Sequence, residues 1–184
     1  VIYFGDGATE EGSFSESLNF AKLHDLPIIF VCENNLYSVY THIGKRQHKD
    51  RDICNIVEAH GIKTFSGDGN NVLEVCDLAF KARSAIIKES GPVFLNFSTY
   101  RWLEHCGPNY DNHLKYREPN EVKAWTKRCP IELLKDGCKS EQLKEKISFD
   151  EMVSKIKNEV NEAINYAKNS AFPEETDLFK DIYQ

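Results

Sequence analysis

Two apolar runs bracket a helical pattern in the first 35 residues, and this arrangement constrains the fold more than any other feature of the chain. Residues 1–4 and 28–32 each have the length and composition of a buried strand. Residues 13–24 between them have the apolar periodicity of a helix. We therefore expect a β-α-β unit with parallel strands, a connection that is almost always right-handed. The apolar helix positions are Phe14, Leu18 and Ala21.

Polar residues follow both predicted strands at the point where each strand ends. Asp6 lies in a Gly-Asp-Gly turn after the first strand, and Asn35 follows the second. The carboxyl ends of neighbouring parallel strands meet at one edge of a sheet, where ligands of open α/β folds bind. One carboxylate and one amide oxygen suit Mg²⁺, which completes its octahedron with phosphate oxygens and water. The sequence thus predicts a magnesium ion that bridges a diphosphate to the protein.

The glycine turn and the helix that follows it offer backbone N–H groups to such a diphosphate. The alternative is a dinucleotide site with the fingerprint G-x-G-x-x-G. That fingerprint requires a glycine at position 10, where this chain has Glu10. A helix that opens with Glu10 and Glu11 would also repel a pyrophosphate not neutralised by a metal. We therefore favour the metal-bridged diphosphate.

The wording of this region resembles a known family. G-D-G and N-N are separated by the 26 residues 8–33, which is the spacing of the thiamine diphosphate motif. The segments GDGATEEGSFSESLNFA and LPIIFVCENNLYSVYT resemble the alpha subunit of the 2-oxo acid dehydrogenases, which include pyruvate, branched-chain and acetoin dehydrogenases. The resemblance continues to the closing FPEETDLFKDIY. It implies a thiamine diphosphate-binding α/β fold with Mg²⁺ and thiamine diphosphate as cofactors.

The resemblance also assigns roles to individual residues around the motif. Asp6, Asn35 and the backbone carbonyl of Tyr37 would bind the metal, and Gly5, Gly7 and Ala8 would lie at the cofactor phosphates. By resemblance Val39 matches the apolar residue that wedges the cofactor into a bent conformation, but from the residues alone we favour the alternative of an ordinary core valine. For Lys45 and Arg46 we expect a solvated loop. Glu33 is not the glutamate that activates the cofactor, because the family takes that residue from its beta chain.

A second functional loop is expected at residues 98–111, after the strand predicted at residues 93–97. It resembles the family loop that begins T-Y-R and has a histidine four residues beyond the arginine. By this resemblance Arg101 contacts the diphosphate, and His105 lies beside the phosphate and the reacting centre as a catalytic residue. Tyr116-Arg117 matches a further family pair.

The same loop departs from the family wording. Pyruvate dehydrogenase subunits have H-G-H-S here, whereas this chain has Leu103-Glu104-His105-Cys106. Cys106 replaces the serine that kinases phosphorylate in mitochondrial enzymes, and a thiol cannot accept that phosphate. We expect no regulation of this kind, and the substrate stays open among pyruvate, another 2-oxo acid and acetoin.

The implied activity is oxidative decarboxylation of a 2-oxo acid, or acetoin cleavage, with acyl transfer to a lipoyl acceptor. The implied partners are a beta subunit in an α2β2 assembly and a lipoyl-bearing acyltransferase. One alternative is transketolase-like or decarboxylase chemistry on the same cofactor. Another is a non-catalytic interaction module. The chain starts without Met and within a strand, so we expect it to be the C-terminal portion of a longer chain.

Composition excludes several other classes. The net charge of −6 over 184 residues argues against a nucleic-acid surface. No run approaches the ~18 apolar residues of a membrane span. The six cysteines include no C-x-x-C pair, which favours free thiols in a reducing compartment. We expect a cytoplasmic protein.

The rest of the chain completes an α/β fold, with a mainly parallel sheet, helices on both faces and a helical C-terminal tail. We expect a diphosphate- and metal-binding α/β domain at residues 1–120 and a helical extension packed on it at 121–184. Gly67-Asp68-Gly69-Asn70-Asn71 repeats the motif letters without a β-α-β unit between them, so we interpret it as a turn with an Asn helix cap. The expected further elements are strands at 62–65 and 93–97, helices at 52–60, 72–89, 121–128 and 131–135, and a helix that begins at Ser148.

Overall fold

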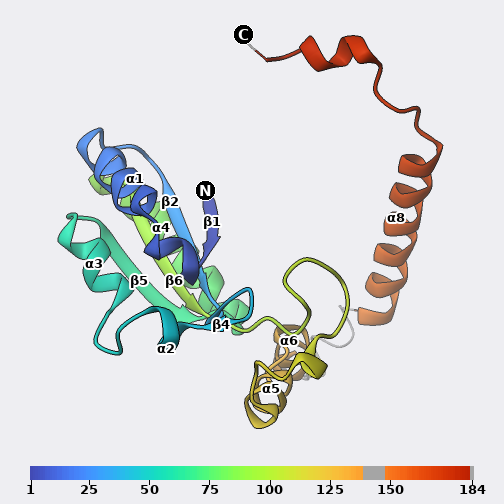
Figure 1. Ribbon diagram of the computed structural model, residues 1–184, viewed down its shortest axis with the longest axis horizontal. Helices are drawn as coiled ribbons and strands as arrows, with labels where there is room; N and C mark the ends of the chain where they lie inside the picture. The colour runs from blue at the N-terminus through green and yellow to red at the C-terminus, as the bar shows by residue number, and fades with distance from the viewer. Residues whose placement is uncertain (139–147, 183–184) are drawn as a thin grey trace. The chain divides into compact units, whose positions relative to one another are not determined.

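The computed structural model describes residues 1–138 and 148–182 (Figure 1). The chain divides by its contacts into two units, Val1–Gly137 and Cys138–Gln184, which are described separately. The domain boundary expected at residue 120 stays a prediction. No helix in the described part of the chain combines the length and apolarity needed to cross a membrane.

Four parallel strands form the central sheet of the first unit, in the order β1-β2-β6-β5. The predicted β-α-β unit is confirmed, because β1 pairs parallel to β2 across helix α1. The carboxyl ends of the strands align, since Gly5 pairs with Glu33 and Glu33 pairs with Phe97. The strands are β1 (Ile2–Gly5), β2 (Ile29–Asn34), β5 (Lys63–Asp68) and β6 (Val93–Ser98).

Helices cover both faces of this sheet, as predicted. Alternate strand residues point to opposite faces, so Phe30 and Phe94 meet α1 (Gly12–Leu23) and α3 (Ile53–Ala59), whereas Val31 and Leu95 meet α4 (Val72–Glu89). The core of the first face is Leu18, Ala21, Phe30, Cys32, Ile53, Val57, Ile62 and Phe94. The core of the second face is Val31, Leu78, Ala82, Ala85, Val93, Leu95 and Phe97.

The prediction that the first strand is buried is wrong. Ile2 is 46% exposed and Tyr3 is 68% exposed. The physical reason is the strand order, because β1 lies at the edge of the sheet formed by residues 1–138 and there pairs with β2 alone. Its apolar composition is that of a central strand, but its position is that of an edge strand.

The bounds of α4 match the prediction. Leu78, Ala82 and Ala85 are its buried residues and pack on the sheet, whereas Val72 is 41% exposed. Val72 opens the helix beyond the sheet contact, and its neighbour Asn71 caps the helix by accepting the Glu74 N–H at 3.3 Å.

Shorter elements surround the carboxyl end of the sheet and complete the first unit (Figure 1). The hairpin β3-β4 and the four-residue helix α2 follow β2 directly. These elements are η1 (Asp6–Glu10), β3 (Tyr37–Ser38), β4 (Thr41–His42), α2 (Ile43–Arg46), η2 (Asn112–Leu114), α5 (Pro119–Thr126) and α6 (Pro130–Gly137).

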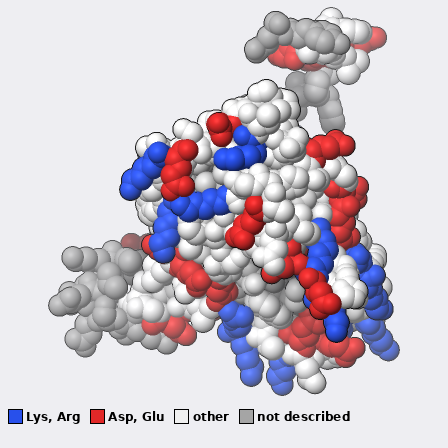
Figure 2. All heavy atoms as spheres, turned by 90° about the vertical axis from the view of Figure 1, so that its left-hand side faces the viewer, with Lys and Arg blue, Asp and Glu red and all other residues white. Residues whose placement is uncertain are grey.

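The described part of the second unit consists of α8 (Phe149–Asn169) and η3 (Glu175–Phe179). Ser148 caps α8, as predicted, by accepting the Glu151 N–H at 3.3 Å. Met152, Ile156 and Val160 form part of an apolar stripe and are about half exposed in this structure. On the face of the molecule drawn in Figure 2, basic and acidic side chains are interspersed.

Candidate functional site

Asp6 begins η1 where β1 ends, at the carboxyl end of the sheet. Its side chain is completely buried. Thr9 closes the first turn of η1 by donating its hydroxyl to the Asp6 carbonyl at 2.7 Å. The Asp6 oxygen Oδ2 accepts from Arg46, whereas Oδ1 is buried without a hydrogen-bond partner among the described residues. A buried carboxylate oxygen without a donor is costly, so Oδ1 is a position suited to a cation.

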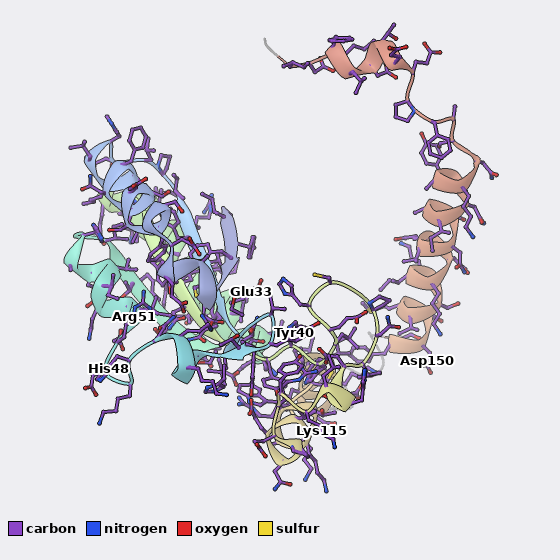
Figure 3. The ribbon with its side chains drawn as sticks, viewed as in Figure 1. Glu33, Tyr40, His48, Arg51, Lys115 and Asp150 are labelled. Carbon is purple, nitrogen blue, oxygen red and sulfur yellow. The ribbon has the colours of Figure 1, made fainter. Side chains whose placement is uncertain are left out.

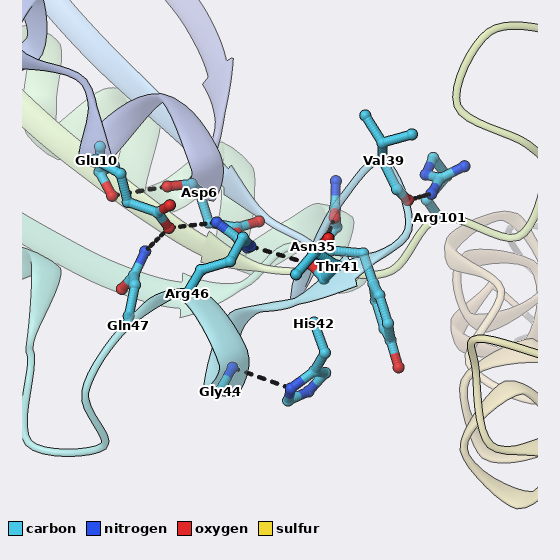
Figure 4. A network of polar contacts seen from close by, with 12 residues as sticks. Asp6, Glu10, Asn35, Val39, Thr41, His42, Gly44, Arg46, Gln47 and Arg101 are labelled. Carbon is cyan, nitrogen blue, oxygen red and sulfur yellow. Dashed lines mark hydrogen bonds and ion pairs between the residues drawn. The ribbon is translucent and has the colours of Figure 1, made fainter.

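Arg46, at the end of α2, is the positively charged partner of the Asp6 carboxylate in this structure (Figure 4). Its guanidinium pairs with both Asp6 and Glu10, and its Nε donates to the Thr41 carbonyl at 3.0 Å. Only 11% of the Arg46 side chain is exposed. The expectation of a solvated loop is therefore wrong for Arg46, because two carboxylates compensate its burial, while Lys45 beside it is exposed.

Arg51 fastens the same segment to η1 (Figure 3). It donates to the Thr9 carbonyl at 2.6 Å and to the Gln47 side-chain oxygen at 2.7 Å. Gln47 in turn donates to Glu10 at 2.6 Å. Residues 46–51 thus hold η1 through a connected set of side-chain hydrogen bonds, and through it they hold Asp6.

Asn35 forms a turn at the end of β2. Its side-chain oxygen accepts the Tyr37 N–H at 3.0 Å, which leaves that oxygen a second lone pair. Tyr37 is buried, and its hydroxyl donates to Glu121 of α5 at 2.9 Å. Burial, followed by the hydrogen bond and charge of Glu121, raises the pKa of Tyr37 above its usual value.

Gly7 allows η1 to approach the β3-β4 hairpin closely. A Cβ atom at this position would lie 2.7 Å from Ser38 Oγ and 2.9 Å from Ser38 Cβ. Two residues of the hairpin region, Leu36 and Val39, have positive φ angles of 70° and 52°. Such angles are uncommon for residues other than glycine, and for β-branched Val39 they imply backbone strain.

The hairpin and the loop after β6 meet at Arg101. Its Nη2 donates to the Val39 carbonyl at 2.6 Å, and its Nη1 donates to the Leu103 carbonyl at 2.7 Å (Figure 4). Two residues assigned to the cofactor by resemblance, 62 positions apart, are thus joined directly. Val39 is 38% exposed, so the alternative of an ordinary core valine is wrong.

A buried ion pair stabilises the loop that carries Arg101. Arg117 pairs with Asp111, and their side chains are 1% and 2% exposed. Arg117 also donates to the Arg101 carbonyl, and Tyr116 donates to Asp111 at 2.5 Å. The Tyr116-Arg117 pair, known from the sequence only as a family match, therefore fixes the backbone that carries Arg101.

His105 and Cys106 lie on the exposed part of the loop. No hydrogen bond or ion pair joins the His105 side chain to another residue of the described chain. Glu104 closes the loop instead, since its carboxylate accepts from the Asn109 side chain at 2.8 Å and its N–H donates to the Asn109 carbonyl at 2.9 Å. The catalytic role of His105 stays a prediction.

The second G-D-G-N-N stretch has a different, structural arrangement. Asp68, the last residue of β5, pairs with Arg128 at 2.5 Å. Asn70 is buried, donates to the Arg128 carbonyl at 2.7 Å, and accepts the Thr99 hydroxyl at 2.8 Å. The stretch is therefore not only a turn, because its first two residues end a strand, and Asn71 is the helix cap that was expected.

The predicted metal ligands fit a magnesium–diphosphate group by their chemistry. Among the described residues no group of three or more His, Cys, Asp or Glu side chains could hold a metal ion. The predicted set has a single carboxylate, so a metal there would need further oxygens from phosphate and water. The unpartnered Oδ1 of Asp6 is consistent with such a ligand, whereas the close approach of Ser38 accounts for the glycine at position 7.

The sequence interpretation missed Arg46, Gln47 and Arg51 as part of the site. They follow the motif in a polar stretch that resembles an ordinary surface loop. The available signal was charge, because a buried Asp6 requires a positive partner.

Comparisons with known proteins find a matching family model and several similar curated proteins. A family model described as dehydrogenase E1 component matches residues 1–176. The 2-oxoisovalerate dehydrogenase subunit alpha 2, mitochondrial, of Arabidopsis thaliana is 30% identical over 184 residues, 100% of this chain and 38% of that protein. The pyruvate dehydrogenase E1 component subunit alpha of Rickettsia felis is 30% identical over 98% of this chain and 54% of its own length. The corresponding Porphyra purpurea subunit is 33% identical over 100% and 52%.

A transketolase structure from Campylobacter jejuni aligns with a TM-score of 0.46 and 22% identity, over 53% of this chain and 15% of that one. The chain spans about half the length, or less, of the curated relatives described above.

Proposed function

The chain belongs to the dehydrogenase E1 component family, and we propose that it forms the alpha part of a thiamine diphosphate-dependent 2-oxo acid dehydrogenase. In this proposal a beta subunit completes an α2β2 enzyme, and a lipoyl-bearing acyltransferase accepts the acyl group. The curated relatives described above are alpha subunits of pyruvate and 2-oxoisovalerate dehydrogenases, which supports a 2-oxo acid as the substrate. A cytoplasmic location stays a prediction.

The observation that carries the proposal is the environment of Asp6. This carboxylate is completely buried at the carboxyl end of a parallel β-α-β unit, and its Oδ1 has no partner among the described residues. Gly7 follows it at a point where a Cβ would collide with Ser38. A buried carboxylate oxygen without a hydrogen-bond donor is a hard ligand of the kind that a metal-bound diphosphate requires.

Bound thiamine diphosphate would supply the nucleophile for the 2-oxo carbon and accept the electron pair left when carbon dioxide departs. The residues of this chain would bind and orient it. Asp6, Asn35 and the Tyr37 carbonyl would hold Mg²⁺, and Gly5, Gly7, Ala8 and Arg101 would contact the diphosphate. Val39 would support the cofactor, and His105 would lie toward the substrate. An assay of the full alpha and beta pair with a lipoyl acceptor, on several 2-oxo acids and on acetoin, decides which of these is the substrate.

Calorimetry of the full-length alpha chain with its beta partner tests the cofactor site. We expect Asp6→Asn and Asn35→Ala each to weaken magnesium-dependent thiamine diphosphate binding, because each removes a ligand oxygen. The affinity should fall by more than a factor of about ten, which corresponds to a loss of more than ~1.4 kcal/mol of binding free energy.

The matched control is Asp68→Asn in the second G-D-G, where the carboxylate pairs with Arg128 instead. We expect its cofactor affinity to equal that of the wild type. Unchanged affinity in both Asp6→Asn and Asn35→Ala would reject the proposed site, and a large loss in Asp68→Asn would show that the other turn binds the cofactor.

A further inference from the structure

Arg46 occupies the place where the proposed site needs a metal ion. Its guanidinium pairs with Oδ2 of Asp6, a side chain with 0% exposure, and with Glu10, whose side chain is 27% exposed. Thr41 accepts the remaining Nε–H at 3.0 Å. The three residues that contact the Arg46 guanidinium group in Figure 4, Asp6, Glu10 and Thr41, therefore all accept from it, and the buried carboxylate is neutralised without a metal.

A divalent metal and a guanidinium would compete for this single buried carboxylate. Their charges have the same sign, and repulsion between them is strong where water is excluded. Asp6 Oδ1 has no hydrogen-bond partner among the described residues, but a metal bound to Oδ1 would lie only a few atoms from the guanidinium group on Oδ2. The metal gains the full charge of Asp6 only when Arg46 withdraws.

We propose that Arg46 is the resident cation of Asp6, that the metal must displace it, and that the displaced guanidinium then binds the diphosphate that arrives with the metal. This inference rests on the proposed function. Arg46 ends a helix of four residues between the short β4 strand and the segment fastened by Arg51, so it can shift without moving the sheet. A planar guanidinium suits phosphate oxygens, to which it donates two parallel hydrogen bonds.

The exchange makes metal and diphosphate depend on each other. A metal ion that binds without diphosphate has to displace the Arg46 guanidinium from Asp6, and the guanidinium then finds no other anion. The metal ion alone therefore binds weakly. Metal with diphosphate offers Arg46 a new partner, so the pair binds together. Arg46 thereby weakens binding of the metal alone and strengthens binding of the metal together with diphosphate. A residue with only a structural role would not change these two affinities in opposite directions.

The test measures Mn²⁺ and cofactor binding separately in the full-length alpha chain with its beta partner. Free Mn²⁺ is counted by electron paramagnetic resonance, with no thiamine diphosphate present. We expect Arg46→Gln to tighten binding of Mn²⁺ alone by about tenfold, because a competing charge is gone. We expect the same variant to weaken Mg²⁺-dependent thiamine diphosphate binding by about tenfold, the loss of one charge-assisted contact.

Lys45→Gln is the matched control, since it removes the same charge one residue away on an exposed side chain. It should change neither affinity by more than about twofold, because exposed charges are screened. Arg46→Lys keeps the charge without the planar fork, and it should shift both affinities in the directions of Arg46→Gln by smaller factors. It decides the question alone if Arg46→Gln does not fold.

The outcomes separate this inference from the proposed function. If Arg46→Gln weakens binding of both Mn²⁺ alone and thiamine diphosphate, or changes neither affinity, the proposed exchange is wrong. This holds whether or not Asp6→Asn abolishes cofactor binding. If Asp6→Asn leaves cofactor binding intact, the proposed function itself fails.

Discussion

Cys32 lies in the middle of β2 with no exposed surface, and it packs in the core between the sheet, α1 and α3. Burial, followed by the nearby Asp6 carboxylate, raises the pKa of its thiol from 9.0 to about 12. The other five cysteines are also free thiols, and Cys76 and Cys106 are exposed. Cys32 therefore reports the integrity of the core beneath the site.

This pKa predicts how stability changes in alkaline solution. Between about pH 9 and pH 12 the thiol stays protonated in the folded chain and ionises in the unfolded chain, so the unfolded state binds fewer protons. The free energy of unfolding should fall as pH rises, by up to ~1.4 kcal/mol per pH unit from this group. Urea unfolding at several pH values should give a shallower slope for Cys32→Ala than for the wild type.

Cys76→Ala is the control for this measurement, because its thiol is exposed and its removal should leave the slope unchanged. Equal slopes for Cys32→Ala and the wild type would show that the buried thiol is not linked to folding.

Single residues show where sequence reasoning reached its limit. Asp6 and Asn35 could be found because the ends of two strands locate them in the chain. Arg46 was missed, because the two carboxylates that satisfy its charge lie 36 and 40 positions away in the sequence. Val39 was ambiguous for a similar reason, since its exposure depends on a left-handed backbone that no local pattern predicts.

At the scale of elements, the loop after β6 depends on the Asp111–Arg117 pair. Asp111→Asn would leave the Arg117 guanidinium buried without its counter-charge, at a cost of about 3–5 kcal/mol. We expect denaturant unfolding to show this loss. We also expect protease cleavage between Trp102 and Asp111 to accelerate, because Arg117 holds the backbone of Arg101.

The matched control is Asp77→Asn, the same chemical change in an exposed pair with Lys81 at 2.7 Å. Surface pairs contribute about 0–1 kcal/mol, so this variant should unfold and be cleaved like the wild type. If the two variants behave alike, the buried pair does not support the loop.

Most elements could be predicted because each has a local signal. The bounds of α4 were predicted to the residue, and α1 and β6 to within one residue at each end, from the apolar patterns and from punctuating residues such as the Gly91-Pro92 pair between α4 and β6. The course of residues 98–117 could not be predicted. Its shape depends on hydrogen bonds to backbone carbonyls and on one buried ion pair, and neither leaves a periodic pattern.

For the whole molecule, we expect residues 1–184 alone to have no 2-oxo acid dehydrogenase activity. The chain spans about half the length of its relatives, and the proposed site is shared with a beta subunit. Ligand at one hundred times its dissociation constant stabilises a fold by about 2.7 kcal/mol. That would raise the melting temperature by about 5–10 °C for a domain of this size, and we expect far less with millimolar thiamine diphosphate and Mg²⁺.

The positive control is the full-length alpha chain with its beta partner, which should show both turnover and the full thermal shift. Robust turnover of any 2-oxo acid by residues 1–184 alone would overturn the two-subunit proposal.

The exposed edge strand has a consequence for handling the protein. One backbone edge of β1 has no partner among the strands of the described residues, and the strand carries apolar Ile2 and Tyr3 at its surface. An unpaired apolar edge is a template for another strand. Two molecules of residues 1–184 could join edge to edge and extend one sheet across both. Self-association in concentrated solution would then begin at β1, and a lysine in place of Tyr3 would oppose it.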